Sequence, residues 1–344
     1  MRCADYVRVM KTPHLGLLAI VMTLITTPAA LSAKLPIEGP MPSFARADAW
    51  LNSRPLSTQE LRGKVVLVDF WTYTCINWRR TLPYLRAWAE KYRDHGLVIV
   101  GVHTPEFTFE QNVANVRRAA QEQDVDYPIA LDSDYAIWSA FDNHYWPAVY
   151  LVDARGRIRH QQFGEGNYEQ LERVIQQLLA ESGKTGFDRA PVTPDTRGAE
   201  VAADWKSLGS AETYIGSRQA ERRVSAAPSS LKLNQWALTG DWTTRDEFAV
   251  LNNTGGKIAY RFHARDVHLV MGPSTRGATV RFRVSLDGQP PRASHGVDVD
   301  AEGYGTLDQP RMYQLIRQPA PVADRQIEIE FLDLGAELFV FTFG

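Results

Sequence analysis

Cysteine is scarce in this 344-residue chain, which contains only Cys3 and Cys75. Cys3 lies in a basic opening that precedes an apolar run over residues 15–25 and small residues up to Ala33. This order is typical of a secretory signal peptide, which is removed on export. We therefore expect cleavage near Ala33, after which the mature protein has one thiol, at Cys75, and forms no internal disulfide.

A long hydrophobic run is also missing. The run over residues 15–25 is shorter than the roughly 20 residues that a membrane-spanning helix needs. We expect an exported protein, periplasmic or extracellular, without a stable transmembrane segment. Retention of residues 1–33 as an N-terminal membrane anchor is the alternative.

The chain has no marked excess of charge of either sign. Lys and Arg number 38 against 40 Asp and Glu, which gives a formal net charge of −2. A mildly acidic protein gives no electrostatic reason to expect nucleic acid as a partner. Apolar residues make up 44% and charged residues 23%, the composition of a folded protein, and the length is sufficient for two domains.

Strand and helix patterns alternate over residues 34–184. Apolar runs predict buried strands at residues 65–71, 97–102 and 148–152, the last followed by a hairpin with Gly156 in its turn. Helical spacing predicts helices at about residues 75–93, 109–120 and 168–181. The resulting order, β-α-β-α-β-β-α, predicts an α/β domain with helices on both faces of a partly parallel sheet.

The pattern changes in the second half of the chain. Residues 185–209 are rich in Pro, Asp, Arg, Gly and Ala, which predicts a linker. Over residues 210–344 apolar and polar residues alternate, as in Ile258-Ala259-Tyr260-Arg261-Phe262. Many short strands of this kind predict an antiparallel β-sandwich or jelly roll.

Cys75 stands where the predicted strand at residues 65–71 gives way to a helix. Free amide N–H groups and the positive end of a helix favour a thiolate at such a place, and they lower the thiol pKa. A cysteine can equally be a small buried apolar residue. The position alone leaves both interpretations open.

The segment Val68-Asp69-Phe70-Trp71-Thr72-Tyr73-Thr74-Cys75-Ile76-Asn77-Trp78 resembles the active-site strand and helix of the thioredoxin superfamily. Asp69 stands where that family keeps a buried carboxylate, Pro83 where its helix kinks, and Trp146-Pro147 where its cis-proline loop faces the cysteine pair. The resemblance implies a thioredoxin-like fold. It also implies that Cys75 is the nucleophile, Asp69 the buried proton acceptor or donor and Pro147 the backbone dock for a bound chain.

Two further segments narrow the resemblance. Trp71-Thr72-Tyr73-Thr74-Cys75-Ile76-Asn77 together with Gly101-Val102-His103-Thr104-Pro105-Glu106-Phe107 is similar to the DipZ-type branch near the TlpA-like redoxins. Residues 210–216 resemble the start of the β domain that follows the redoxin domain in DipZ-type proteins, a module with a fold like that of carbohydrate-binding modules. The resemblance implies a ligand or a protein partner for this β domain. The membrane-embedded part of those proteins has no counterpart in the sequence.

The chain departs from the family at one position. Members that cycle electrons carry Cys-x-x-Cys, whereas this sequence reads Cys75-Ile76-Asn77-Trp78. In such members the second thiol resolves the mixed disulfide that the first thiolate forms with a substrate. With Trp78 at the resolving position, that step cannot occur within the chain.

Three functions follow as hypotheses. The first is a monothiol thiol-disulfide oxidoreductase acting through Cys75, whose partner is a thiol- or disulfide-containing protein or a small thiol. The second is a redox-inactive binding or scaffold protein on a thioredoxin fold. Thiol peroxidase is less favoured, because the sequence lacks a Pro-x-x-x-Thr-x-x-Cys pattern. We expect no cofactor and no metal, since no pair of histidines has short ligand spacing on one element.

Several residues are expected to flank the site: Trp71, Trp78, Trp146, Glu106 and His144. For Glu106 a solvated loop acid is the simpler interpretation, and for His144 a surface position. Arg79-Arg80 is either a partner-facing patch or plain solvated surface. The aromatic residues Trp236, Trp242, Tyr304 and Tyr313 either form a face for a flat ligand or fill the core of the second domain, which is the simpler interpretation.

Overall fold

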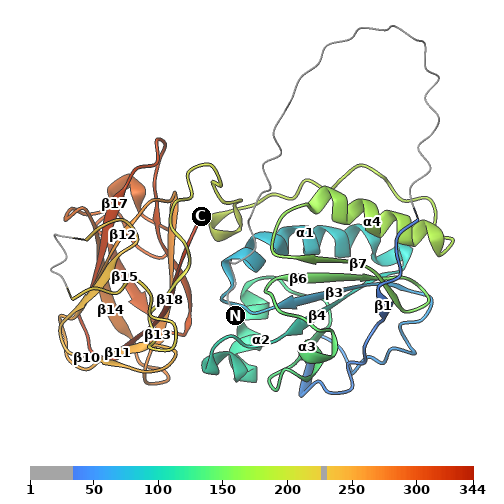
Figure 1. The fold of residues 1–344 in the computed structure, drawn as a ribbon, viewed down its shortest axis with the longest axis horizontal. Coiled ribbons are helices and arrows are strands. Elements are labelled where there is room, and N and C mark those ends of the chain that lie inside the picture. Colours follow the sequence, from blue (N-terminus) through green and yellow to red (C-terminus); the bar gives the residue numbers. More distant parts are fainter. Residues whose placement is uncertain (1–33, 226–230) are drawn as a thin grey trace, which may run out of the picture.

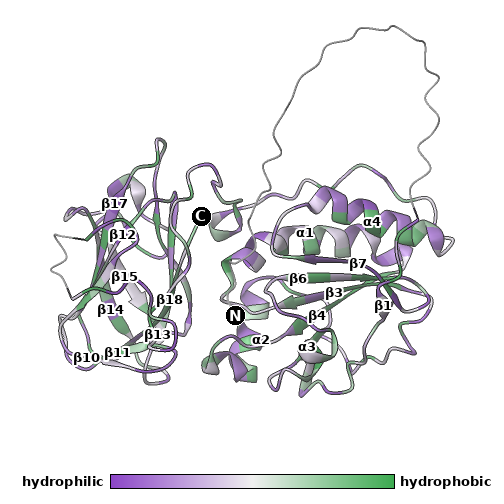
Figure 2. Ribbon diagram, viewed as in Figure 1, coloured by the Kyte–Doolittle hydropathy of each residue, from purple (hydrophilic) through white to green (hydrophobic). Residues whose placement is uncertain are grey.

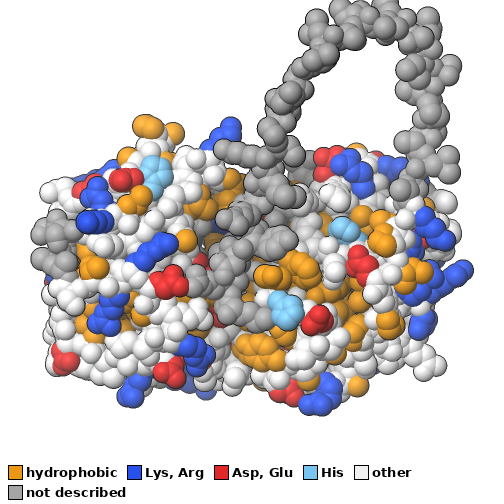
Figure 3. All heavy atoms as spheres, in the orientation of Figure 1, with side chains coloured by type: hydrophobic (Ala, Val, Ile, Leu, Met, Phe, Trp, Pro, Cys, Tyr) orange, Lys and Arg blue, Asp and Glu red, His pale blue; other side chains and the backbone are white. Residues whose placement is uncertain are grey.

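The computed structural model describes residues 34–225 and 231–344, which form an α/β domain and a β domain side by side (Figure 1). The predicted signal peptide, residues 1–33, lies outside the described residues. Within the described ranges, every helix is too short or too polar to span a membrane. On the face drawn in Figure 3, acidic and basic side chains are interspersed rather than gathered by sign.

The α/β domain is built on one sheet of seven strands in the order β1-β7-β6-β3-β4-β5-β2. Their bounds are β1 Gly39–Pro40, β2 Ala49–Leu51, β3 Val65–Trp71, β4 Leu97–His103, β5 Ile129–Leu131, β6 Ala148–Val152 and β7 Arg157–Phe163. β3 runs parallel to β4 and antiparallel to β6. All seven residues of β3 are buried, as a strand covered on both faces requires, and Figure 2 shows hydrophobic residues concentrated on the central strands.

Helices cover both faces of this sheet, as predicted. They are α1 Ile76–Tyr92, α2 Val113–Glu122, α3 Ala136–Ala140 and α4 Tyr168–Glu181, with α1 and α4 on one face and α2 and α3 on the other (Figure 1). The helix expected at about residues 109–120 is divided into a 3₁₀ turn, η2 Thr108–Gln111, and α2. The division falls at Asn112, because its extended backbone ends the turn and its side chain caps α2 by accepting from the Ala114 N–H at 2.9 Å.

The β domain is a sandwich of two antiparallel sheets, which confirms the predicted fold class. One sheet has the order β10-β11-β18-β13-β16, with β8 paired to β18, and the other has the order β15-β14-β17-β12-β9. The bounds are β8 Thr213–Tyr214, β9 Trp236–Thr239, β10 Trp242–Thr244, β11 Ala249–Leu251, β12 Lys257–Phe262, β13 Asp266–Pro273, β14 Val280–Leu286, β15 Tyr304–Leu307, β16 Arg311–Arg317, β17 Arg325–Phe331 and β18 Ala336–Phe343. The short helical turns are η1 Arg93–His95, η3 Gly198–Glu200 and η5 Arg292–Ser294.

The four aromatic residues singled out in the β domain do not form one face. Trp236 and Tyr313 are fully buried in the core, as the simpler interpretation predicted. Trp242 is half-buried with its ring 5.8 Å from that of Phe331, whereas Tyr304 is 48% exposed.

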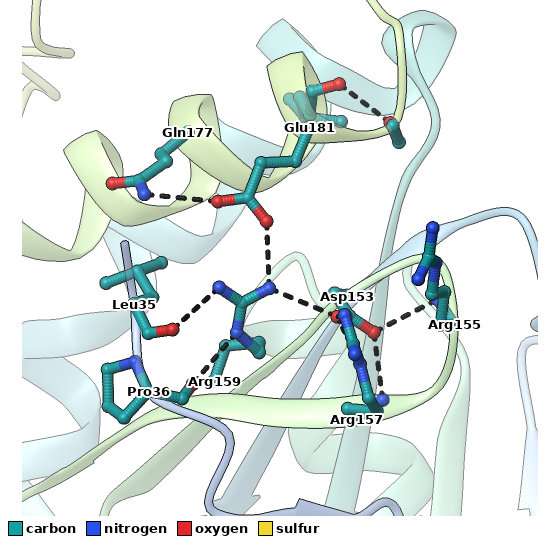
Figure 4. A network of polar contacts seen from close by, with 10 residues as sticks. Leu35, Pro36, Asp153, Arg155, Arg157, Arg159, Gln177 and Glu181 are labelled. Atoms are coloured by element: carbon teal, nitrogen blue, oxygen red, sulfur yellow. Dashed lines mark hydrogen bonds and ion pairs between the residues drawn. The ribbon is translucent and has the colours of Figure 1, made fainter. Parts of the chain in front are cut away.

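A buried arginine joins the first described residues of the α/β domain to the end of its last helix, α4. Arg159 on β7 is 1% exposed, and its guanidinium lies 2.8 Å from the Glu181 carboxylate at the end of α4 and 3.2 Å from Asp153 (Figure 4). It also donates to the carbonyls of Leu35 and Pro36, each at 2.8 Å. Every nitrogen of this guanidinium therefore has an acceptor, which is what makes a buried cation tolerable.

Candidate functional site

Cys75 lies at the junction that the sequence predicted, between the end of β3 and the first residue of α1. It is the N-cap of α1, with an extended backbone (φ −70°, ψ 116°), and its carbonyl accepts from the Arg79 N–H at 3.0 Å. Its side chain is 2% exposed, and the structure gives it as disulfide-bonded. The only other cysteine of the sequence, Cys3, lies outside the described residues. The single thiol expected after loss of residues 1–33 stays a prediction.

The position of the missing resolving thiol is filled by a buried indole. Trp78 is fully buried and stacks on Trp71, with ring centroids 4.1 Å apart and an angle of 23° between the planes. Its Nε1–H donates to Oδ2 of Asp69 at 2.9 Å. The carboxylate that the family resemblance implied is thus present, and its partner is the tryptophan.

Asp69 is fully buried on β3, and this burial governs its ionisation. Burial raises the pKa of Asp69 to about 7, against the opposing hydrogen bond from Trp78. The buried Tyr127 hydroxyl also lowers the pKa of Asp69, but it forms no hydrogen bond of normal geometry, and Oδ1 of Asp69 has no other hydrogen-bond partner among the described residues. A carboxyl group in this state gains or loses a proton near neutral pH, and the role of Asp69 as proton acceptor or donor stays a prediction.

The loop before β6 lies at the same edge of the sheet as the end of β3. The register pairs Phe70 with Ala148, so the cis Trp146-Pro147 peptide stands next to the end of β3. Trp146 is 2% exposed, and its Nε1–H donates to the carbonyl of Thr104 at 3.1 Å. The Pro147 carbonyl accepts from the Gly164 N–H at 2.8 Å. Hydrogen bonds of both residues of the cis peptide therefore fix the position of this loop.

Glu106 is not the solvated loop acid that the simpler interpretation predicted. It is half-buried, accepts from the Tyr214 hydroxyl of the β domain, and lines a small pocket of about 150 Å³ together with Trp146. Burial, together with the charge of Glu212, raises the pKa of Glu106 well above its ordinary value. The reason for the difference is tertiary, because the β domain covers the end of β4.

Sequence reasoning missed Glu110, which organises the loop that follows β4. It is 1% exposed, accepts from the Thr74 hydroxyl at 2.7 Å, and accepts from the N–H groups of Glu106 and Phe107 at 2.7 and 3.0 Å. Thr74 precedes Cys75, so this carboxylate joins the strand-to-helix turn to the loop. An acid three residues after the start of a helical turn is the local signal that could have identified it.

His144 and His103 differ in their burial. His144 is exposed and its Nε2 lies 3.3 Å from Asp142, which agrees with the simpler surface interpretation rather than with a role beside the thiol. His103 is 2% exposed, with its ring 4.9 Å from Trp71 and 5.8 Å from Tyr73. Burial lowers the pKa of His103 to about 3, so it is neutral at physiological pH. Among the described residues, no three His, Cys, Asp or Glu side chains cluster as metal ligands would.

The β domain covers the helix end that carries Cys75. Ile76 and Phe107 belong to a buried apolar cluster with Val270, Phe339 and Val340 of the β domain. This contact covers the predicted exchange site with a second domain, and no local signal in the sequence predicts it.

Arg80 also differs from both alternatives that the sequence left open, because it is neither a partner-facing patch nor solvated surface. It is 2% exposed, pairs with Glu165 at 3.0 Å, and donates to the Phe343 carbonyl of the β domain at 3.2 Å. Its neighbour Arg79 is half-buried and faces a cleft between the two domains. Both arginines therefore belong to the domain interface.

Each half of the chain matches a known protein family. Residues 37–178 match the family model described as Redoxin, and residues 210–344 match the one described as Thioredoxin like C-terminal domain. Protein DipZ of Mycobacterium tuberculosis is 38% identical over 327 residues, which are 91% of this chain and 44% of that protein. The chain thus spans less than half the length of this relative.

Two other similarities concern the first half of the chain. Thiol-disulfide oxidoreductase YkuV of Bacillus subtilis is 34% identical over 146 residues, which are 42% of this chain and 98% of that protein. A solved structure described as a thioredoxin-like protein in the oxidised form is 35% identical, covers 42% of this chain and 96% of its own, and has a TM-score of 0.39.

Proposed function

We propose that this chain, which belongs to the thioredoxin superfamily through a redoxin domain and a thioredoxin-like C-terminal domain, is an exported thiol-disulfide exchange protein. In this proposal Cys75 is the nucleophile, and residues 34–184 and 210–344 are two domains joined by residues 185–209. Support comes from the relative YkuV, which is named a thiol-disulfide oxidoreductase. Export rests on the signal-peptide pattern of residues 1–33.

One observation carries the proposal: Cys75 occupies the N-cap position of the 17-residue helix α1. The aligned peptide dipoles of a helix place positive potential at that end, which stabilises a thiolate and so favours nucleophilic attack. No acidic residue occupies the first turn of α1 to offset this potential. Asp69 is the proposed proton acceptor or donor, and Pro147 the proposed dock for a bound chain.

The exchange proceeds in two displacements. The Cys75 thiolate attacks one sulfur of a substrate disulfide, so that a mixed disulfide forms and the other substrate sulfur leaves as a thiolate. Because Trp78 occupies the resolving position, a thiol from a second molecule attacks the substrate sulfur, and Cys75 leaves as a thiolate. The substrate and the second molecule end joined by a new disulfide, so the net reaction exchanges thiols without an external oxidant.

The test uses the full chain with Cys3→Ser, reduced before use, so that Cys75 is its only thiol. We measure by mass spectrometry the rate of mixed-disulfide formation with oxidised glutathione as a function of pH. We expect the rate to rise with an apparent pKa clearly below the ~8.5 of an ordinary cysteine. Cys75→Ser in the same background is the control without reaction. A rate that follows an ordinary thiol pKa, or no adduct at all, would contradict the proposal.

Trp78→Cys in the same background tests whether the resolving step is what the chain lacks. Because an intramolecular thiol has a large effective concentration, we expect this variant to reduce insulin with dithiothreitol, an activity absent from the unsubstituted chain. Trp78→Ala is the matched control, since it also removes the indole that stacks on Trp71 but adds no thiol. Activity in both variants, or in neither, would show that the resolving position is not the limiting difference.

A redox-inactive binding protein is the second candidate, favoured by the burial of the sulfur. Cys75 is 2% exposed, and Ile76 next to it packs into the cluster that includes Phe339 of the β domain. In this candidate the α/β domain is a platform for a partner. A Cys75→Ser chain that restores the cellular phenotype of a deletion strain would favour it over thiol exchange.

A further inference from the structure

A second cleft lies between the two domains, apart from the predicted exchange site. Its volume is about 630 Å³, within the range typical of small-molecule sites. Residues of α1, α2, η3 and the β domain line it, among them Tyr73, Arg79, Arg118, Gln123, Arg311 and Gln314. Cys75, Asp69 and Pro147 do not line it. The cleft is therefore separate from the residues proposed for thiol exchange.

The arginines of this cleft differ in whether they have a partner. Arg311 pairs with Asp298 at 2.7 Å, and Arg197 pairs with Asp195 at 2.7 Å. Glu200, another lining residue, accepts two bonds from Arg86 at 2.8 Å.

The guanidinium of Arg79, by contrast, makes no hydrogen bond or ion pair with any residue that the structure describes. Its Nε is buried and has no acceptor. The Nε of Arg118 is also buried without a hydrogen bond, although it forms an ion pair with Glu122 at 3.8 Å. The cleft therefore presents buried N–H donors that have no hydrogen-bond acceptor among the described residues.

The position of Arg79 is unfavourable for the fold in two ways. It lies in the first turn of α1, where the helix dipole destabilises a cation. Burial lowers the pKa of Arg79, which means that its charge is poorly solvated. Arg80 and Arg159, the other buried arginines described above, each have carboxylate partners. The carboxylates of Glu200 and Asp298 favour the Arg79 charge from a distance, but each is paired with another arginine, Arg86 and Arg311, so a bound anion is the natural direct counterpart of Arg79.

The same cleft also contains acceptors without donors, which indicate that the ligand carries N–H groups. The side-chain oxygens Oε1 of Gln123 and Gln314 are buried and accept no hydrogen bond from the described residues. A bare inorganic anion would satisfy the arginines and leave these oxygens without donors. A ligand that carries both a carboxylate and N–H groups satisfies both sets.

We propose that this interdomain cleft binds a small peptide-like carboxylate, whose carboxylate is held by Arg79 and whose N–H groups donate to Gln123 and Gln314. Arginine suits this role because its planar guanidinium matches a carboxylate in a bidentate pair. Since both domains line the cleft, occupancy also stabilises their contact.

The test is isothermal titration of the full chain with triglycine, its C-terminal amide and inorganic phosphate. We expect saturable binding of triglycine, and binding weakened by about tenfold or more for the amide and for Arg79→Met, as loss of a charged hydrogen bond implies. Arg93→Met is the matched control, because Arg93 is an exposed arginine of η1 paired with Asp126 outside the cleft. It should leave triglycine binding unchanged.

Thermal unfolding of the same variants without ligand gives a second measurement. Arg79→Met removes an unpaired, poorly solvated cation from a helix N-terminus, so its Tm should equal or exceed that of the unsubstituted chain. A lower Tm would show that Arg79 serves the fold and would overturn the inference. It would equally be overturned by phosphate binding more tightly than triglycine, by equal triglycine affinity in Arg79→Met, or by no saturable binding up to about 20 mM.

Discussion

Asn at position 69 should make the stability of this protein less dependent on pH. The pKa of Asp69 is about 7 in the folded chain, against about 3.9 for an unperturbed aspartate. The folded state therefore holds the proton more tightly than the unfolded state, and stability falls as the pH rises from about 4 to about 7. Above this window the ionised, buried carboxylate destabilises the fold by about 4 kcal/mol, from roughly 3 pKa units at 1.36 kcal/mol each.

The assay is urea unfolding of the unsubstituted chain and Asp69→Asn at several pH values between about 4 and 8. Asparagine does not ionise and retains an oxygen that can accept from the Trp78 indole. The difference in free energy of unfolding between the two proteins should rise by about 1.4 kcal/mol per pH unit within the window, in favour of Asn, and then level off. All other titrating groups are common to both chains and cancel in the difference.

Two further variants sharpen this experiment. Trp78→Phe removes the hydrogen bond that stabilises the Asp69 carboxylate, so the pH window in the otherwise unsubstituted chain should move upward. Asp142→Asn is the control, because the Asp142 side chain is 95% exposed and its loss should change stability by less than about 0.5 kcal/mol. A difference between Asp69→Asn and the unsubstituted chain that does not vary with pH would refute the reasoning.

The remaining predictions concern the contact between the two domains. Arg80→Met should lower the free energy of unfolding by about 3–5 kcal/mol, because it leaves the buried Glu165 unpaired. Arg93→Met, which breaks an exposed ion pair, should lower it by less than about 1 kcal/mol. Equal losses for the two variants in urea unfolding would contradict this. Phe339→Ala should cost about 3–5 kcal/mol and also speed maleimide labelling of reduced Cys75, since Phe339 packs in the cluster over the start of α1. Phe331→Ala, in the core of the β sandwich, is the matched control, and faster labelling in this variant too would argue against local opening at the interface.

The contacts between the two domains limit how an exchange partner can reach Cys75. The Tyr214 hydroxyl donates to Glu106, and the Thr108 hydroxyl donates to Glu247 at 2.9 Å, so polar contacts of the two domains surround the apolar cluster. Cys75 is 2% exposed and does not line the small pocket beside Trp146, so in the proposed function a partner that reaches Cys75 must separate these contacts. In the proposed function the β domain therefore restricts which partners reach Cys75.

The local architecture could be predicted from the sequence because its signals are local. The apolar run at residues 65–71 and the helix that begins after Cys75 follow from hydrophobic period and helix geometry, and the structure has β3 and α1 at these places. The alternation over residues 210–344 likewise predicted antiparallel sheets. Comparison with known families then confirmed the resemblance drawn from the residues around Cys75.

What the sequence could not determine were the partners of its charged residues. Arg80 bonds to the carbonyl of Phe343, 263 positions away, and Glu106 to Tyr214, 108 positions away. No periodicity or motif encodes contacts at such separations, because they depend on how two domains pack. For the same reason only the tertiary structure showed that Arg80 pairs with a glutamate while the neighbouring Arg79 makes no ion pair with any described residue. The strand and helix patterns around Cys75 by themselves determined that it lies at the start of a helix. Only the packing of the two domains decided which residues surround it, because those residues are distant in the sequence.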